Sequence, residues 1–179
     1  IRLVLRRLSH VARGTMTGSE SPLKQYRRFE SFREYEALLD GWVPRTVSVI
    51  RVFEHSLPAA WNNASRMALL REFLRANPVN RLFVLIHDAS NIERSLPRLC
   101  DLQRDFGHAF KLRLTPRIAK HVYDPFAVFD ASHYLHRFHY KHMRAAEGIH
   151  DADGAGELLE RFSEMWEVSA PQSASTGGL

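Results

Sequence analysis

One short apolar segment constrains the fold of this chain more than any other feature. The run "RLFVLIHD" (81–88) is almost continuously apolar, yet it is far shorter than the ~20 residues that a membrane span requires. Such a run is typical of a strand that is buried on both faces of a sheet. The segment therefore predicts an internal strand with helices packed above and below it.

Further strand patterns flank this run. "TVSVIRVF" (46–53) is rich in β-branched residues, and "AFKLRLT" (109–115) alternates as a strand does. Two later segments, "YDPFAVFD" (123–130) and "SHYLHRFHY" (132–140), also suit strands, with a turn near Asp130. These two segments predict an antiparallel hairpin towards the C-terminus.

Helical patterns occupy the intervals between the strands. Capping boxes begin at Ser31 and Ser90, residues 63–77 carry apolar side chains at helical spacing, and Asp153 precedes an amphipathic C-terminal segment. Pro97 is expected to divide the helix that follows Ser90 or to start its second part. The alternation predicts an α/β fold: a mainly parallel sheet with helices on both faces and a C-terminal antiparallel hairpin.

Charge and length indicate one domain preceded by a basic N-terminal segment. The 25 basic and 20 acidic residues give a net charge of +5, but four arginines and no acid lie in residues 1–15, so the remainder carries 21 against 20, or +1. The net charge of that remainder gives no argument for a polyanionic partner. We expect a flexible basic segment at 1–28, an α/β domain at 29–168 and a tail at 169–179. A single cysteine fits a reducing, cytoplasmic compartment.

Four histidines recur at every third position: His133, His136, His139 and His142. On a strand, alternate residues point to opposite faces, and on a helix steps of three drift by about 60° each. Neither geometry gathers all four side chains around one ion. The row therefore does not predict a metal site, and no motif predicts a cofactor.

The same stretch offers candidates for anion binding. One face of the predicted strand and the residues after it carry several donors, namely His133, Arg137, His139, Lys141 and Arg144. Cationic donors that converge near one strand end suit a phosphate group. The alternative interpretation is a solvated basic surface.

The hairpin resembles the signature of phospholipase D-like phosphodiesterases, H-x-K-x-x-x-x-D. In that family the His attacks phosphorus, the Lys holds the phosphate oxygens, and Gly-Ser-x-Asn follows on the next strand. "YDPFAVFD" has the same length but places Tyr123 and Pro125 at the His and Lys positions, and only Asp130 matches. Residues 137–140, "RFHY", replace Gly-Ser-x-Asn. Tyrosine is a poor nucleophile at neutral pH, since its usual pKa is about 10, and proline supplies no charge. The resemblance thus implies an inherited fold without its catalytic pair.

The succession of segments over about residues 29–179 is similar to a proteobacterial domain of uncharacterised function. The similarity rests on "RLFVLIHDASNIERSLPRLCDLQRDFGHAFKLRL", "YDPFAVFDASHYLHRFH" and "LLERFSEMWEVSAP". That domain is a degenerate phospholipase D-like module, sometimes joined to a GNAT-type acetyltransferase. No Gly-rich acetyl-coenzyme A loop is present in this chain.

These features lead to three functional hypotheses. The first is a non-catalytic binding or regulatory module with a protein partner, for which the resemblance suggests an acetyltransferase. A second copy of the chain is also a candidate partner, because active members of the superfamily combine two such halves. The second hypothesis is a nucleic-acid or phosphate-binding module that uses the 133–144 strand. The third is a residual phosphodiesterase in which His133 or His139 serves as a rearranged nucleophile.

Overall fold

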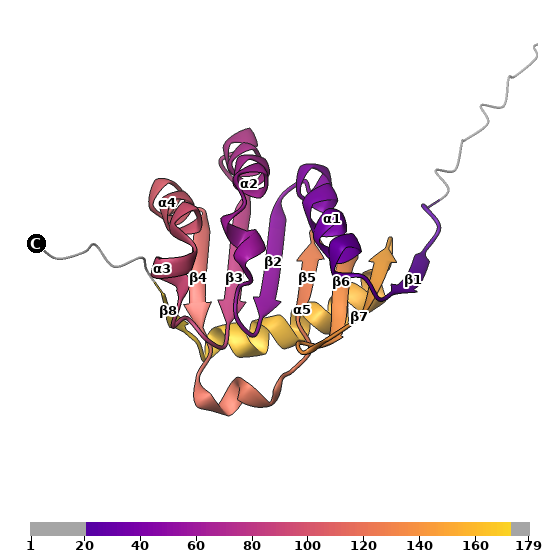
Figure 1. Cartoon of the computed structure of the whole chain (residues 1–179). Coiled ribbons are helices and arrows are strands. Elements are labelled where there is room, and N and C mark those ends of the chain that lie inside the picture. Colours follow the sequence, from indigo (N-terminus) through magenta and orange to yellow (C-terminus); the bar gives the residue numbers. More distant parts are fainter. Residues whose placement is uncertain (1–20, 173–179) are drawn as a thin grey trace, which may run out of the picture.

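Eight strands form a single sheet in the order β1-β7-β6-β5-β2-β3-β4-β8 (Figure 1). This computed structural model describes residues 21–172, so the basic segment at 1–15 and the end of the tail lie outside the described residues. The strands are β1 Gln25–Phe29, β2 Val49–Glu54, β3 Arg81–Ile86, β4 Phe110–Leu114, β5 Phe126–Phe129, β6 His133–His139, β7 His142–Ile149 and β8 Ala170–Pro171.

The sheet is mixed, which corrects the expectation of a mainly parallel one. Only β2–β3 and β3–β4 pair in parallel, through helical crossovers. Strands β5, β6 and β7 follow one another through turns too short for a crossover, so they pair antiparallel. The predicted hairpin is present as β5–β6, whereas β7 was not predicted as a strand.

Helices cover the sheet on both faces (Figure 1). The apolar residues of α1, α2 and α4 share one core cluster with one face of the sheet, and those of α5 pack against the other face. The helices are α1 Phe32–Trp42, α2 Ala64–Ala76, α3 Ile92–Ser95, α4 Pro97–Asp105 and α5 Ala152–Glu167, with short 3₁₀ turns η1 Val43–Arg45, η2 Ala59–Asn62 and η3 Arg117–His121. None of the helices in residues 21–172 is long and apolar enough to cross a membrane.

The helix starts agree only partly with the sequence patterns. Ser31 caps α1 by accepting the amide of Glu34 at 3.2 Å, as its capping box predicts, and Pro97 begins α4. The box at Ser90 is not used, because the N-cap of the short helix α3 is the next residue and makes no side-chain bond. A pattern of residue types does not ensure the backbone geometry that a cap needs.

Two edge segments extend the sheet beyond the expected domain boundaries. Residues 25–28, which we placed in the N-terminal segment, belong to β1 and pair with β7, and residues 170–171 of the expected tail pair with β4. Lys24 forms an ion pair of 2.8 Å with Asp151, which caps α5 in place of Asp153 by accepting the amide of Gly154 at 3.0 Å. Pairing with distant strands thus orders segments whose own sequences lack a clear period.

Candidate functional site

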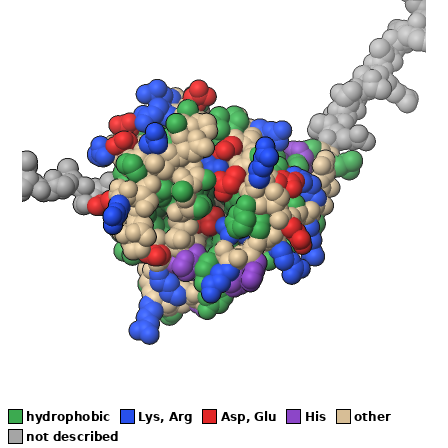
Figure 2. Space-filling model, viewed as in Figure 1, with side chains coloured by type: hydrophobic (Ala, Val, Ile, Leu, Met, Phe, Trp, Pro, Cys, Tyr) green, Lys and Arg blue, Asp and Glu red, His purple; other side chains and the backbone are tan. Residues whose placement is uncertain are grey.

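The four histidines of the row lie in three different environments. His133 stacks on Trp42 at 4.5 Å between ring centroids, and His136 Nε2 lies 2.7 Å from Asp124 Oδ2. His139 and His142 lie together at the far end of β6, with centroids 5.3 Å apart. Figure 2 shows histidine side chains in separate places on the molecular surface. Within residues 21–172, no group of three or more His, Cys, Asp or Glu side chains could hold a metal ion.

Arg137, one of the anion-binding candidates, is buried and is 6% exposed. Its Nη2 donates to the carbonyl of Tyr140 at 2.7 Å, and its Nη1 lies 3.4 Å from a carboxylate oxygen of Glu54. Rings of Phe32 and Tyr35 cover the guanidinium at 5.2 and 5.6 Å. Burial raises the pKa of Glu54 to about 7, although the Arg137 charge opposes this shift. The guanidinium of Arg137 is therefore held by contacts inside the protein.

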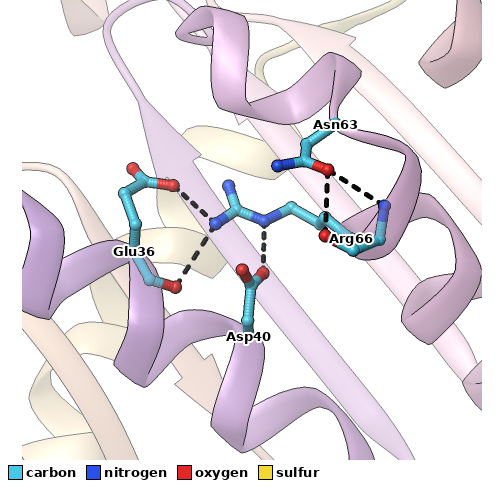
Figure 3. Close-up of polar contacts among 5 residues, drawn as sticks. Glu36, Asp40, Asn63 and Arg66 are labelled. Carbon is cyan, nitrogen blue, oxygen red and sulfur yellow. Dashed lines mark hydrogen bonds and ion pairs between the residues drawn. The ribbon is translucent and has the colours of Figure 1, made fainter.

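A second buried arginine holds α1, the helix that covers Arg137. Arg66 of α2 is 1% exposed, and its Nε and Nη2 each lie 2.5 Å from carboxylate oxygens of Asp40 and Glu36, both on α1 (Figure 3). Breaking a buried pair of this kind leaves an uncompensated charge and is strongly unfavourable. Arg66 thus joins α2 to α1, the helix that also carries Phe32 and Tyr35.

The positions that correspond to the phosphodiesterase signature lie at the two ends of β5. Tyr123 and Pro125 precede the strand, and their carbonyls accept the amides of Tyr140 at 2.9 Å and Arg137 at 2.8 Å. Tyr123 is 52% exposed. The segment at 137–140 therefore lies directly beside the segment that contains Tyr123 and Pro125. The side chains of Tyr123 and Pro125 supply neither an imidazole nor a cation.

Asp130, the one matching residue, has a structural task at the opposite end. Its carboxylate accepts the amides of Val47 and Ser48 at 2.8 Å and of Val49 at 3.1 Å, together with the Ser48 hydroxyl at 3.0 Å. Burial would raise the pKa of Asp130, but these hydrogen bonds outweigh it and hold the pKa below its usual value. Asp130 therefore fixes the loop that enters β2.

Two histidines outside the anion-binding candidates follow β2 and β3, and one of them stacks on Tyr140, whose ring in turn stacks on Tyr123. His55 follows β2 and stacks on Tyr140 at 4.2 Å, and His87 follows β3 at 5.7 Å from His55. His87 is buried, with Nε2 2.8 Å from the carbonyl of Val122, and burial lowers its pKa. Side chains that follow buried parallel strands are the signal that could have found them, since such strand ends commonly face ligands.

A shallow groove lies at the end of the β1–β7–β6 side of the sheet. It has a volume of about 800 Å³ and is lined by Arg28, Phe138, His139, His142 and Arg144. The guanidinium of Arg28 lies over the Phe138 ring at 5.5 Å. The groove contains two of the five anion-binding candidates, His139 and Arg144. Arg28 and His142 complete a lining of two arginines, two histidines and one phenylalanine that the sequence did not predict as one site.

The remaining candidates lie elsewhere. His133 is at the other end of β6, and Lys141 is exposed at the turn to β7, with its amine 5.6 Å from the centroid of Tyr140. Arg137 is buried as described. The structure thus brings together a different set of cations from the one that strand alternation indicates, because a register irregularity between Arg137 and His139 changes which side chains meet.

Comparison with solved structures identifies the fold. The phospholipase D family member Nuc from Salmonella typhimurium superposes with a TM-score of 0.64 at 14% identity, covering 85% of this chain and all of that one. NucT from Helicobacter pylori gives a TM-score of 0.57 at 8% identity, with 84% of this chain and all of that one covered. TrmBL2, an archaeal chromatin protein, gives 0.60 at 14% identity, covering 86% of this chain and 57% of that protein.

Sequence comparison gives the family. No curated protein matches the chain. A family model described as "Domain of unknown function (DUF7931)" matches residues 42–175, which include β2 to β8 and four of the five α-helices. The chain therefore belongs to the DUF7931 domain family and has a phospholipase D-like fold.

Proposed function

We propose that this chain is a non-catalytic binding or regulatory module on a phospholipase D-like fold. The observation that carries the proposal is the chemistry beside β5. Tyr123 and Pro125 stand where a nucleophile and a phosphate-holding cation would be needed, and the adjacent Arg137 is committed to Glu54 and to the Tyr140 carbonyl. Phosphoryl transfer depends on a cation that is free to meet the developing charge.

Other basic side chains near this position also have hydrogen-bond partners. The Lys120 amine donates to the carbonyl of His87, and both ring nitrogens of His87 have partners, Thr115 and Val122. His139 accepts the amide of Lys141 at Nδ1, at 3.1 Å, which leaves Nε2 as its outward nitrogen. Of the two histidines expected as rearranged nucleophiles, His139 is the one that stacks beside Tyr123, at 5.9 Å between ring centroids, so it is the first to test.

A hydrolysis assay tests this proposal. The full chain is incubated with bis(p-nitrophenyl) phosphate and with labelled DNA and RNA, and we expect no product above buffer. His139→Ala is the diagnostic variant, and His108→Ala is the control, because His108 is an exposed histidine near β4, remote from β5. Turnover that survives in the control and disappears in His139→Ala would establish a rearranged nucleophile and overturn the proposal.

One observation favours a second candidate function, the binding of nucleic acid or another phosphate ligand. The groove at the end of β6 and β7 presents Arg28 and Arg144 on an open surface, and among residues 21–172 the acidic side chain that contacts these arginines is Glu30, 3.9 Å from Arg144. Phosphate contacts of this kind weaken as salt rises, because they release counterions. Fluorescence anisotropy with labelled oligonucleotides at about 50 and 200 mM salt tests it. Salt-sensitive binding that Arg28→Gln with Arg144→Gln removes is the expected result.

A protein partner is proposed for the module as well. An acetyltransferase or a second copy of the chain would be compatible with a non-catalytic role. Analytical ultracentrifugation of the full chain distinguishes the second of these, since a homodimer doubles the sedimenting mass. A monomer at all concentrations would leave a different protein as the proposed partner.

A further inference from the structure

The groove lies on a part of the sheet that α5 leaves uncovered. Helix α5 begins beside β6, where Asp151 accepts the Tyr134 hydroxyl at 2.9 Å, and its buried residues pack on β5 and the parallel strands. The outer strand β1 and the far end of β6 keep exposed aromatic side chains. Tyr26 of β1 is 49% and Phe138 of β6 is 37% exposed.

Aromatic and basic side chains interleave on this uncovered surface. Tyr26 Oη accepts Arg28 Nε at 3.4 Å, and the same guanidinium lies over Phe138, which gives a row of ring, guanidinium and ring. Proteins bind single-stranded nucleic acid with aromatic rings that stack on the bases and basic side chains that contact the phosphate backbone. A duplex, whose bases are already stacked, could use only the cations.

The groove also carries two imidazoles, those of His139 and His142. The groups around His139 and His142 are Arg28 from β1, Arg144 from β7, the backbone amide of Lys141, and the rings of Tyr123, Phe138 and Tyr140. Among residues 21–172, the acidic side chain that contacts this set is Glu30, 3.9 Å from Arg144. A phosphate that enters the groove would therefore supply the negative charge that these imidazoles lack.

We infer that the groove binds single-stranded nucleic acid and takes up a proton on His139 or His142 when it does so. The inference rests on the second candidate function above. Imidazole titrates between about pH 5 and 8, and a phosphate beside it favours the protonated form. Because the bound state then holds more protons than the free state, affinity rises as pH falls. One proton is expected per binding event, since the two rings are too close for both to gain charge at low cost.

The magnitude follows from the charge count. Because the bound form holds one more proton than the free form, the Kd is expected to fall by about tenfold between about pH 8 and pH 5.5. The salt dependence should also steepen, because each added cation contributes roughly 0.7 to the slope of log affinity against log salt for a single strand. The two arginines alone would give a slope of about −1.4, and the protonated form about −2.1.

Anisotropy titrations of the full chain with fluorescein-labelled oligothymidylate at about pH 8 and pH 5.5 test this inference. His139→Gln with His142→Gln should reduce the tenfold pH ratio to near one, whereas His108→Gln should keep it. Arg28→Gln with Arg144→Gln should weaken binding at both pH values, which separates the groove from the arginines of residues 1–15 that every variant shares.

The outcomes are distinguishable. No binding by the wild type at either pH would remove the candidate function itself. Binding with equal Kd at both pH values, or a pH ratio that survives the double histidine variant, would overturn the proton coupling alone. Equal competition by inorganic polyphosphate or by a duplex of the same sequence would overturn the assignment to single strands, because neither ligand offers an unstacked base to Phe138 and Tyr26.

Discussion

Replacing Asp130 should destabilise the fold through the loop before β2. This carboxylate accepts three backbone amides, of which those of Ser48 and Val49 are partly buried and that of Val47 is exposed. Water can replace the hydrogen bond to the exposed amide. The loss of the hydrogen bond to each partly buried amide would lower the free energy of unfolding by about 1 to 1.5 kcal/mol. Asp130→Ala should therefore lower the free energy of unfolding by about 2 to 3 kcal/mol.

A second contribution comes from the backbone at this position. Asp130 has a φ of 55°, a left-handed conformation that aspartate and asparagine tolerate better than alanine. Asp130→Gly removes the same hydrogen bonds without this strain, so it should be less damaging than Asp130→Ala by about 1 kcal/mol. Asp130→Asn keeps the size and one acceptor and should cost about 1 kcal/mol.

The effect should also depend on pH. Because the folded pKa of Asp130 is lower than its usual value, the carboxylate stabilises the fold above that usual value, and this stabilisation is lost as pH falls through the folded pKa. The stability gap between wild type and Asp130→Asn should thus be full near neutral pH and narrow below about pH 4.

Urea unfolding followed by tryptophan fluorescence measures each of these differences. Asp101→Ala is the matched control, because its carboxylate pairs with Arg104 on the surface and is 56% exposed, so it should change stability by less than about 1 kcal/mol. If all three Asp130 variants unfold like the control, the hydrogen bonds to the loop contribute nothing to stability and the structural role assigned to Asp130 is wrong.

Three further predictions concern the packing, charge and capping of the fold. A Cβ at Gly148 would lie 2.2 Å from the Tyr134 ring, so Gly148→Ala should lower the free energy of unfolding by about 1 to 3 kcal/mol. A Cβ at Gly156, in helix α5, would meet nothing within 4 Å, so Gly156→Ala should raise it by about 0.5 to 1 kcal/mol in the same urea series. Burial raises the pKa of Glu54 to about 7, so the folded state binds the proton more tightly than the unfolded state and loses stability as pH rises from 4.5 to 7. The stability of Glu54→Gln should therefore match that of wild type near pH 4.5 and exceed it by roughly 1 to 3 kcal/mol above pH 7. A stability difference that does not change with pH would contradict this prediction. Ser31→Ala removes the α1 cap and should lower the free energy of unfolding by about 1 kcal/mol. An unchanged thermal unfolding midpoint would show that the cap does not contribute to stability.

Elements whose own residues carry the signal could be predicted from the sequence. β3 is buried on both faces, and this leaves an apolar run that needs no partner to be recognised. β7 was missed, because it contains Ala145, Ala146 and Gly148, and alanine and glycine have little strand preference of their own. Its place in the sheet comes from pairing with β1 and β6 on either side.

The candidate site was predictable only in part for a related reason. Alternation along β6 placed Arg137 on a binding face, but its partner Glu54 lies 83 residues away in sequence, and that distance hides the pairing. Arg28 was missed because it belongs to a strand that only β7 orders. His139 and Arg144, both among the expected candidates, line the same groove because β6 and β7 form a hairpin that brings them together.

The order of the strands sets the distance between the first and the last strand of the chain. β1 and β8 occupy opposite edges of the eight strands (Figure 1). With neighbouring strands about 4.8 Å apart, the seven intervals between them place the two edges roughly 34 Å from each other. Two proteins attached through the segments that lead into β1 and out of β8 would be held apart by about the width of a small domain. A circular permutant would need a linker of at least about ten extended residues to join the same two edges.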